Sequence, residues 1–381
     1  MRKRFLLFFV VVFLAVILLI VHWQSRSVSS PTSQQPDETE LSGRQLKEHY
    51  LRNVPRTITI GAVGDILIHD RVYRDAETKD GYDFTPMLED VKPLLSQPDI
   101  VIANQESILG GTELGLSSYP SFNSPQEVGD ALIESGIDIV STANNHTLDR
   151  GEEAILRAIA YYERNGLPYV GHFKDREDQK RIRIIEKKGI RVAFLAYTYG
   201  TNGIPVPEGK DYLVNLIELD AIREEVERAQ SIADCIVLSI HWGKEYERYP
   251  NEHQKELARE FASMGVDIIF GHHPHVLQPL EWIETEAGTT FVAYSLGNFL
   301  AGQSYPDPGK DFGGLVTIDV VKGNADHGST IQLKKPQFYP TYIYSENEQN
   351  YRVIPLKNTD SLPDAEKKYE EIMAHVMQWI E

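Results

Sequence analysis

The sequence is poor in cysteine and in positive charge. Its only cysteine, Cys235, lies in the apolar run DCIVLSI, so no disulfide can form within the chain and the core must hold the fold. Asp and Glu number 56 against 38 Lys and Arg, which leaves a net charge of −18 at pH 7. A surface this acidic excludes general nucleic-acid binding and broad docking on anionic lipid. Internal repeats are also missing.

One long apolar segment is present at the N-terminus. Basic residues at positions 2–4 precede an unbroken apolar run over residues 5–21, which Trp23 closes. At 1.5 Å per residue this run reaches about 25 Å, close to the minimum for a membrane span. A cleaved signal peptide is the alternative, but HWQSRS offers no small-x-small cleavage site. We therefore expect residues 1–23 to be a single-pass signal anchor in the cell membrane, with the remaining chain outside the cytoplasm.

The remaining chain divides into three parts by composition. Residues 24–51 are rich in Ser, Gln, Pro and Glu without apolar periodicity, which predicts a flexible extracytoplasmic stalk. We assign residues 52–335 to one large domain and residues 336–381 to a C-terminal extension. The extension ends in an amphipathic segment, 362–381, that is typical of a terminal helix.

Within the large domain, β-rich segments alternate with helical patterns. Val- and Ile-rich runs without polar alternation predict strands buried on both faces at 57–64, 99–104, 138–144, 191–198, 235–242, 267–272 and 290–298. Amphipathic segments predict helices at 125–136, 151–166, 218–233 and 251–265. This alternation predicts an α/β layered domain. Two later segments, 313–323 and 328–344, are typical of hairpin strands, which we expect to extend the second sheet.

Polar residues gather where six of these predicted strands end. They are Asp65, Asn104, Glu106, Asn144, Asn145, His146, His241, His272, His273, His275, Ser295 and Asn298. Each one alone has an ordinary explanation, such as a turn, a helix cap or a buried histidine with a hydrogen bond. Ligands of α/β sheets bind at the carboxyl ends of the strands, so these side chains are expected to converge in one crevice.

The residue types at these strand ends favour a metal centre. Carboxylates, an amide oxygen and several imidazoles, without a thiolate, suit Mn²⁺, Zn²⁺ or Fe at an open catalytic site. Two metals need a bridging carboxylate, which Glu106 or Asp65 can supply, and such a pair activates water toward a phosphoryl group. In the GHHPH segment we expect His272 to be a ligand. Whether His273 or His275 is the second ligand stays open, and we favour His275.

Other residues beside the crevice suit an anionic substrate. Lys244 and Arg248, in HWGKEYERYP, are the best-placed cations, although the same residues are also typical of a solvated helix start. Asn104 and Asn298 complete the predicted substrate-binding group.

Five ordered motifs carry a family resemblance. VGDILIHD, ANNHTLDRG, HWGKEY, GHHPHVLQPLE and YSLGNFL follow one another after the N-terminal anchor, over about residues 57–315. In this order they resemble the bacterial capsule-synthesis CapA family, which is associated with poly-γ-glutamate capsule formation. That family is in turn similar to the calcineurin-like metallophosphoesterases. The resemblance implies a four-layered α/β/β/α sandwich with a dinuclear divalent metal centre.

The resemblance also implies individual roles. Its metal ligands correspond to Asp65, Glu106, Asn145, His241, His272 and His275, with Glu106 as the bridging residue. His146 corresponds to the histidine that protonates the leaving group or steadies the transition state. Two positions depart from the phosphoesterase pattern, because Leu67 stands where a histidine is usual and GHHPH is one residue longer than Gly-His-x-His.

The function implied is that of a membrane-anchored extracytoplasmic component of poly-γ-glutamate synthesis or export. Its expected partners are membrane-embedded synthase subunits, and its expected substrate is an anionic polymer. The alternatives are a freestanding metal-dependent phosphoesterase and a metal-binding scaffold without turnover. Because a chain with a net charge of −18 repels polyglutamate over most of its surface, we expect contact to be local, through metal or through Lys244 and Arg248.

Overall fold

The computed structural model describes residues 54–303, 309–323, 330–357 and 359–380. The predicted anchor at 1–23 and stalk at 24–51 therefore lie outside the described residues. Over the described ranges, every helix is too short or too polar to cross a membrane. Asn53–Glu381 forms one compact unit, which contains all the elements described below.

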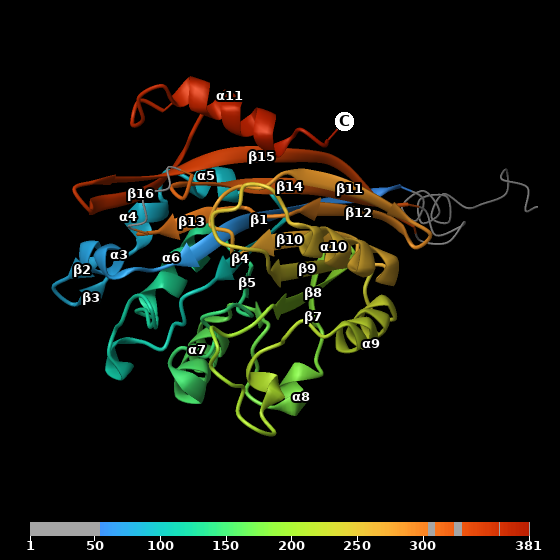
Figure 1. Cartoon of the computed structure of the whole chain (residues 1–381), viewed down its shortest axis with the longest axis horizontal. Helices are drawn as coiled ribbons and strands as arrows, with labels where there is room; N and C mark the ends of the chain where they lie inside the picture. The colour runs from blue at the N-terminus through green and yellow to red at the C-terminus, as the bar shows by residue number, and fades with distance from the viewer. Residues whose placement is uncertain (1–53, 304–308, 324–329, 358, 381) are drawn as a thin grey trace, which may run out of the picture. The chain divides into compact units, whose positions relative to one another are not determined.

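Two mixed β-sheets form the centre of this unit (Figure 1). The strands of the first sheet are β1 (Arg56–Leu67), β4 (Ile100–Gln105), β5 (Ile139–Ser141), β6 (Tyr169–Val170), β13 (Asn298–Ala301), β14 (Phe312–Lys322), β15 (Ile331–Glu346) and β16 (Gln349–Pro355). They follow the order β16-β15-β14-β1-β4-β5-β6, and β13 pairs with β1. Because β4 runs parallel to β1, and β5 and β6 continue in the same direction, their carboxyl ends meet at one edge.

The second sheet has the order β11-β12-β10-β9-β8-β7. Its strands are β7 (Arg183–Lys187), β8 (Ile190–Thr198), β9 (Cys235–His241), β10 (Ile268–His272), β11 (Leu280–Thr285) and β12 (Gly288–Ala293). The four central strands β8, β9, β10 and β12 are parallel, and the edge strands β7 and β11 are antiparallel to their neighbours.

Helices cover the outer faces of the two sheets. The longer ones are α6 (Glu127–Ser135), α7 (Gly151–Asn165), α9 (Leu219–Gln230), α10 (Glu252–Met264) and α11 (Ala365–Val376). Short helices are α3 (Asp70–Asp75), α4 (Thr85–Leu88), α5 (Lys92–Leu95), α8 (Arg176–Gln179), η2 (Thr112–Leu114) and η3 (Asp211–Leu213), and a small ribbon joins β2 (Glu77–Thr78) to β3 (Gly81–Tyr82). The ends of α10 match the helix predicted at 251–265. Asn251 and Gln254 form a capping box at its start, and Gly265 ends the helix in a left-handed conformation.

Alternate residues of the second sheet enter two different cores. On β9, Cys235 and Val237 pack between the sheets, whereas Ile236 and Leu238 pack against α9 and α10. Figure 1 shows α6 and α7 beside β4 and β5, and α9 and α10 beside β8 and β9. The expected burial of these strands on both faces is therefore confirmed, as is the mixed α/β class.

The structure differs from the sequence expectation in three places. The strand predicted at 290–298 is two strands, because the chain leaves β12 and, after the turn at Gly297 with φ of 65°, enters β13 in the other sheet. The hairpin β14–β15 joins β1 in the first sheet and does not extend the sheet that contains β8 to β12. β15 also continues across residues 335 and 336, the predicted boundary between the large domain and the C-terminal extension.

Candidate metal centre

Strand register brings the predicted site residues to one place. In the first sheet Asp65 on β1 lies opposite both Asn104 on β4 and Asn298 on β13. In the second sheet His241 on β9 lies opposite His272 on β10. Because parallel strands hold their carboxyl ends level, residues far apart in the sequence become neighbours at the sheet edges.

A glycine fixes the position of Asp65. A side chain at Gly64 would place its Cβ 2.0 Å from the carbonyl oxygen of Gly297, so only glycine allows this approach. The register of β1 shifts on both sides of Asp65, and the Asp65 backbone N–H donates to the same Gly297 carbonyl at 2.9 Å. This irregularity turns the Asp65 carboxylate toward the neighbouring sheet edge.

The Asp65 carboxylate is buried and contacts several side chains. Its Oδ1 accepts a hydrogen bond from Asn104 Nδ2 at 2.8 Å and lies 3.3 Å from His272 Nδ1. Its Oδ2 lies 3.2 Å from His275 Nδ1 and accepts from the His273 backbone N–H at 3.3 Å. One carboxylate thus touches all three histidines of the GHHPH segment.

The Glu106 carboxylate, by contrast, lacks hydrogen-bond donors. Both of its oxygens are buried without a hydrogen-bond partner among the described residues. Imidazole nitrogens surround Oε1, with His241 Nε2 at 3.5 Å and His275 Nε2 at 3.8 Å. A buried carboxylate left without donors is costly, by about 1–3 kcal/mol or more, unless a cation meets it.

These residues fit a divalent cation. One ligand atom each from Glu106, His273 and His275 lie within 4.8 Å of one another, as ligands around one ion do. Nε2 of His272 and Nδ1 of His273 are also buried without hydrogen-bond partners in the described ranges. Carboxylate and imidazole donors without thiolate suit Mn²⁺, Zn²⁺ or Fe.

The three histidines of GHHPH take different positions. His275 Nδ1 contacts oxygens only, Asn298 Oδ1 at 3.0 Å and Asp65 Oδ2 at 3.2 Å, so Nδ1 carries the hydrogen and Nε2 is free for a metal. His273 is closer to the cluster than the sequence suggested, because its ring reaches Glu106 and His275. Its backbone φ of 96° is strained, at a cost of about 1–3 kcal/mol, which is typical of functional sites.

The pKa values of the two carboxyl groups at the centre are shifted in opposite directions. Burial raises the pKa of Asp65, but contacts with His272 and His275 outweigh it and hold that pKa well below its usual range. Burial raises the pKa of Glu106 to about 8, against the opposing effect of His275. Burial lowers the pKa of His275, yet Glu106 and Asp65 raise it to about 9. Burial holds the pKa of His241 well below its usual value, so this ring is neutral.

Metal binding is expected to depend on pH. Without metal the neighbouring Glu106 and His275 side chains retain protons as a pair, because burial raises the pKa of Glu106 and the nearby carboxylates raise the pKa of His275. Ligands must lose these protons to bind a metal, so uptake should release about one to two protons and affinity should rise between about pH 6 and pH 9. Calorimetry in buffers of different ionisation enthalpy measures the release. An affinity independent of pH would contradict this arrangement.

His146 lies beside the centre with a carboxylate behind it. Asn145 Oδ1 is 2.9 Å from His241 Nε2, and His146 follows directly in the chain. His146 Nδ1 is 2.7 Å from Asp149 Oδ2, which also accepts the Phe122 backbone N–H at 2.7 Å. Asp149 therefore fixes the ring and its tautomer and leaves Nε2 available for proton transfer.

Three residues near the centre were not singled out from the sequence. Asp149 stands three residues after His146, a spacing that points to a local pair once His146 is suspected. Tyr199 and Asn202 come from the segment after β8. The Tyr199 ring lies 4.7 Å from that of His273, and Asn202 contacts both Asn145 and His146. Nothing local in the sequence marks Tyr199 or Asn202, because they reach the site through tertiary contact.

Two of the predicted substrate-binding residues are buried at the centre, and the other two are exposed. Asn104 and Asn298 are buried behind Asp65 and His275, where they orient these side chains. Lys244 is exposed and pairs with Glu247 at 3.0 Å. Arg248 is exposed and lines a separate cavity next to Leu277.

His172 lies apart from this cluster. Its ring packs against Tyr162 and Tyr169, with centroids 6.1 and 5.7 Å away. Burial lowers its pKa to about 3, and neither ring nitrogen has a partner among the described residues. It is a neutral core residue and offers a matched control for substitutions of the site histidines.

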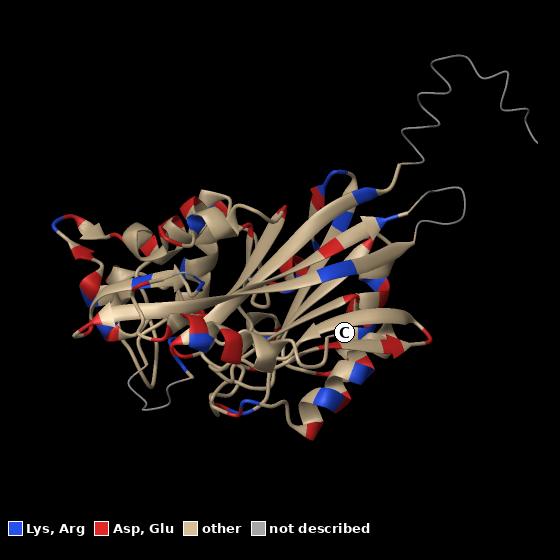
Figure 2. Cartoon of the chain, turned by 90° about the horizontal axis from the view of Figure 1, so that it is seen from above, with Lys and Arg blue, Asp and Glu red and all other residues tan. Residues whose placement is uncertain are grey.

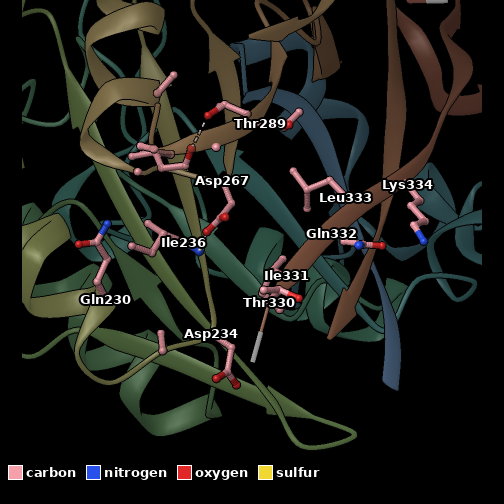
Figure 3. Close-up of a pocket in the computed structure, with 17 residues that line it drawn as sticks. Gln230, Asp234, Ile236, Asp267, Thr289, Thr330, Ile331, Gln332, Leu333 and Lys334 are labelled. Atoms are coloured by element: carbon pink, nitrogen blue, oxygen red, sulfur yellow. Dashed lines mark hydrogen bonds between the residues drawn. The ribbon is translucent and has the colours of Figure 1, made fainter. Parts of the chain in front are cut away.

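A different cavity, of about 690 Å³, opens at the opposite ends of the strands (Figure 3). Figure 3 shows Gln230, Asp234 and Ile236 on one side and Gln332, Leu333 and Lys334 on the other. Ile236 is at the start of β9 and His241 at its end, roughly 17 Å apart at 3.3 Å per residue. This cavity is therefore not the metal centre.

Comparison with known sequences identifies relatives. Residues 59–303, more than half of the chain, match the family described as "Bacterial capsule synthesis protein PGA_cap". "Capsule biosynthesis protein CapA" of Bacillus anthracis is 29% identical over 305 residues, which cover 74% of this chain and 72% of that protein. "PGA biosynthesis protein CapA" of Bacillus subtilis (strain 168) is 29% identical over 262 residues, 64% of this chain and 63% of that protein.

Similar solved structures are more distant. The NAD nucleotidase NadN of Haemophilus influenzae has a TM-score of 0.46 at 12% identity, over 84% of this chain and 59% of that chain. A 5'-nucleotidase precursor from Thermus thermophilus has a TM-score of 0.44 at 13% identity, over 85% of this chain and 59% of that chain. The chain spans less than two thirds of either structure, and likeness at this level establishes no activity. By its sequence match over residues 59–303, the chain belongs to the bacterial capsule synthesis PGA_cap family.

Proposed function

We propose that this chain is a membrane-anchored, extracytoplasmic component of poly-γ-glutamate capsule synthesis or export that carries a phosphoesterase-like divalent metal centre. Family membership supports the capsule role, since two of the relatives are named for capsule or PGA biosynthesis. The proposal includes the signal anchor at residues 1–23, membrane-embedded synthase subunits as partners, and the calcineurin-like four-layered architecture.

One observation carries the metal centre: the buried Glu106 carboxylate, which has no hydrogen-bond donor among the described residues, faces imidazole nitrogens of three histidines. A second carboxylate, Asp65, lies on the other side of His275, which favours a dinuclear site. Such ions polarise a phosphoryl or carbonyl oxygen and make bound water acidic.

Side chains of this protein would supply proton transfer and would orient the metal ligands. His146 Nε2 can donate a proton to a leaving group, because Asp149 accepts the Nδ1 hydrogen and holds the ring in a fixed orientation. Asn298 holds His275 in the tautomer that frees Nε2, and its amide is itself fixed by donating to the Lys310 carbonyl at 2.8 Å. This Asp-His pair favours turnover over the alternative of an inert scaffold.

The capsule role can be tested in the host of this protein. Deleting the gene is expected to abolish cell-bound γ-linked glutamate polymer, and the full chain should restore it. Residues 52–381 exported behind a cleavable signal peptide, without the anchor, should restore about tenfold less, because the domain is no longer concentrated at the membrane. Unchanged polymer in the deletion strain would refute the capsule role.

A further inference from the structure

A cavity of about 640 Å³ lies against the segment that carries His275. Four parts of the described chain line it: the loop after β9, the segment after His275, the beginning of β14, and α11. The residues that matter below are Arg248, Leu277, Phe312, Lys368, Glu371 and His375. Figure 1 shows α11 over β15 at the outer face of the first sheet.

Hydrogen bonds connect the chain segments that form this cavity. The Tyr246 backbone N–H donates to the Pro274 carbonyl at 2.8 Å, and Gln278 Nε2 donates to the Glu247 carbonyl at 2.7 Å. On the other side, His375 Nε2 of α11 lies 3.1 Å from the Leu277 carbonyl oxygen. The cavity is therefore preformed, and α11 is part of its wall as well as a packing element.

Its position links it to the metal centre. Leu277 stands two residues after His275, whose ring is in contact with Asp65 and Glu106. The short segment that carries His275 therefore also forms one wall of the cavity.

The charge of the cavity is opposite to that of the whole chain. Arg248 forms no ion pair with any described residue, while Lys368 pairs with Glu371 at 2.7 Å. Two cations against one anion leave a positive cavity on a chain with a net charge of −18. In Figure 2, which views this side, Lys and Arg are interspersed with Asp and Glu and form no broad basic face. Attraction of an anion is therefore local.

Apolar side chains complete the cavity. Phe312 and Ile372 are buried at its base together with Leu277, and Lys368 Nζ lies 5.9 Å from the Phe312 ring centre. A ligand that alternates carboxylates with methylene groups matches this mixture, because its carboxylates meet the cations and its methylenes cover the apolar base.

We propose that this cavity is a binding subsite for an extended polycarboxylate chain, in which Arg248 and Lys368 hold carboxylates while the chain passes the metal centre. This proposal rests on the proposed function, and it gives the polymer of that function a binding place in this cavity. It assigns a binding role to α11, which the sequence pattern predicted only as a terminal helix.

The test is binding of a fluorescent γ-linked glutamate decamer to the full chain in detergent, followed by anisotropy. Arg248→Gln and Lys368→Gln are each expected to weaken binding about fivefold, and the double variant more than tenfold. Glu371→Gln should tighten binding about threefold, because it removes the only acid among the described residues of the cavity wall. A gain of affinity cannot come from misfolding.

Lys255→Gln is the matched control, since Lys255 pairs with Glu252 at 3.0 Å, as Lys368 pairs with Glu371, but it lies on α10 outside the cavity lining. It should change binding less than twofold. Equal binding of a neutral γ-linked amide decamer, or no effect of the Arg248 and Lys368 variants, would overturn the proposal.

Metal content, measured on the same samples, separates this proposal from the proposed function. A protein that holds metal but binds no decamer contradicts the subsite and leaves the centre intact. A protein without metal that binds the decamer, with the expected variant effects, supports the subsite and contradicts the centre.

Discussion

Replacing Glu106 with Gln is expected to lower the affinity for divalent metal by about 100-fold or more, since it removes the negative charge at the middle of the histidine cluster. Any metal-dependent hydrolysis of a simple phosphate diester, such as bis(p-nitrophenyl) phosphate, should fall by about 1,000-fold. Metal content by elemental analysis and initial rates at saturating Mn²⁺ measure the two effects.

The Glu106→Gln variant should stay folded. Burial raises the pKa of Glu106 to about 8, so in the metal-free protein the charged form is disfavoured and its neutral amide is tolerated. The melting temperature without metal should therefore match or exceed that of the unmodified protein. His172→Phe, which removes a buried histidine outside the centre, should keep its metal. Full metal content in Glu106→Gln would remove Glu106 from the centre.

Replacing His146 with Ala is expected to separate catalysis from metal binding. The rate should fall by about 100-fold to 10,000-fold, because the group that protonates the leaving oxygen is lost. Metal content should stay unchanged, since the ligand atoms of Glu106, His273 and His275 are untouched. Rates and elemental analysis on the same preparation test both statements.

Replacing Asp149 with Asn tests the same proton transfer with a milder change than His146→Ala. It keeps the shape but removes the acceptor of the His146 Nδ1 hydrogen, so we expect a loss of about 10-fold to 1,000-fold and a shifted pH profile of kcat. Substrates with a very acidic leaving group need little protonation and should lose less. An equal loss for good and poor leaving groups would contradict the assignment of His146 as a general acid.

Much of this site was predictable because strand ends are local features. Asp65, His241 and His272 each follow an apolar run, and parallel pairing then places Asp65 beside Asn104 and His241 beside His272. The helix ends were predictable for the same reason, as the Asn251 cap and Gly265 stop of α10 show. Local pattern and tertiary structure agree at these positions.

The remaining features depend on contacts that no local pattern encodes. The break between β12 and β13 arises because the chain crosses from one sheet to the other, although the segment is buried throughout. The role of His273 depends on a backbone φ of 96°, which periodicity does not predict. Tyr199 reaches His273 from a segment more than 70 residues earlier in the chain.

The central claim is that Asp65, Glu106 and the histidines at these strand ends hold catalytic-type metal. Elemental analysis of the full chain, purified in detergent and incubated with Mn²⁺, Zn²⁺ or Fe²⁺ before desalting, tests it most directly. We predict about one to two ions per chain, removed by chelation and absent from the Glu106→Gln variant. Less than about 0.1 ion per chain under all three conditions would contradict the account.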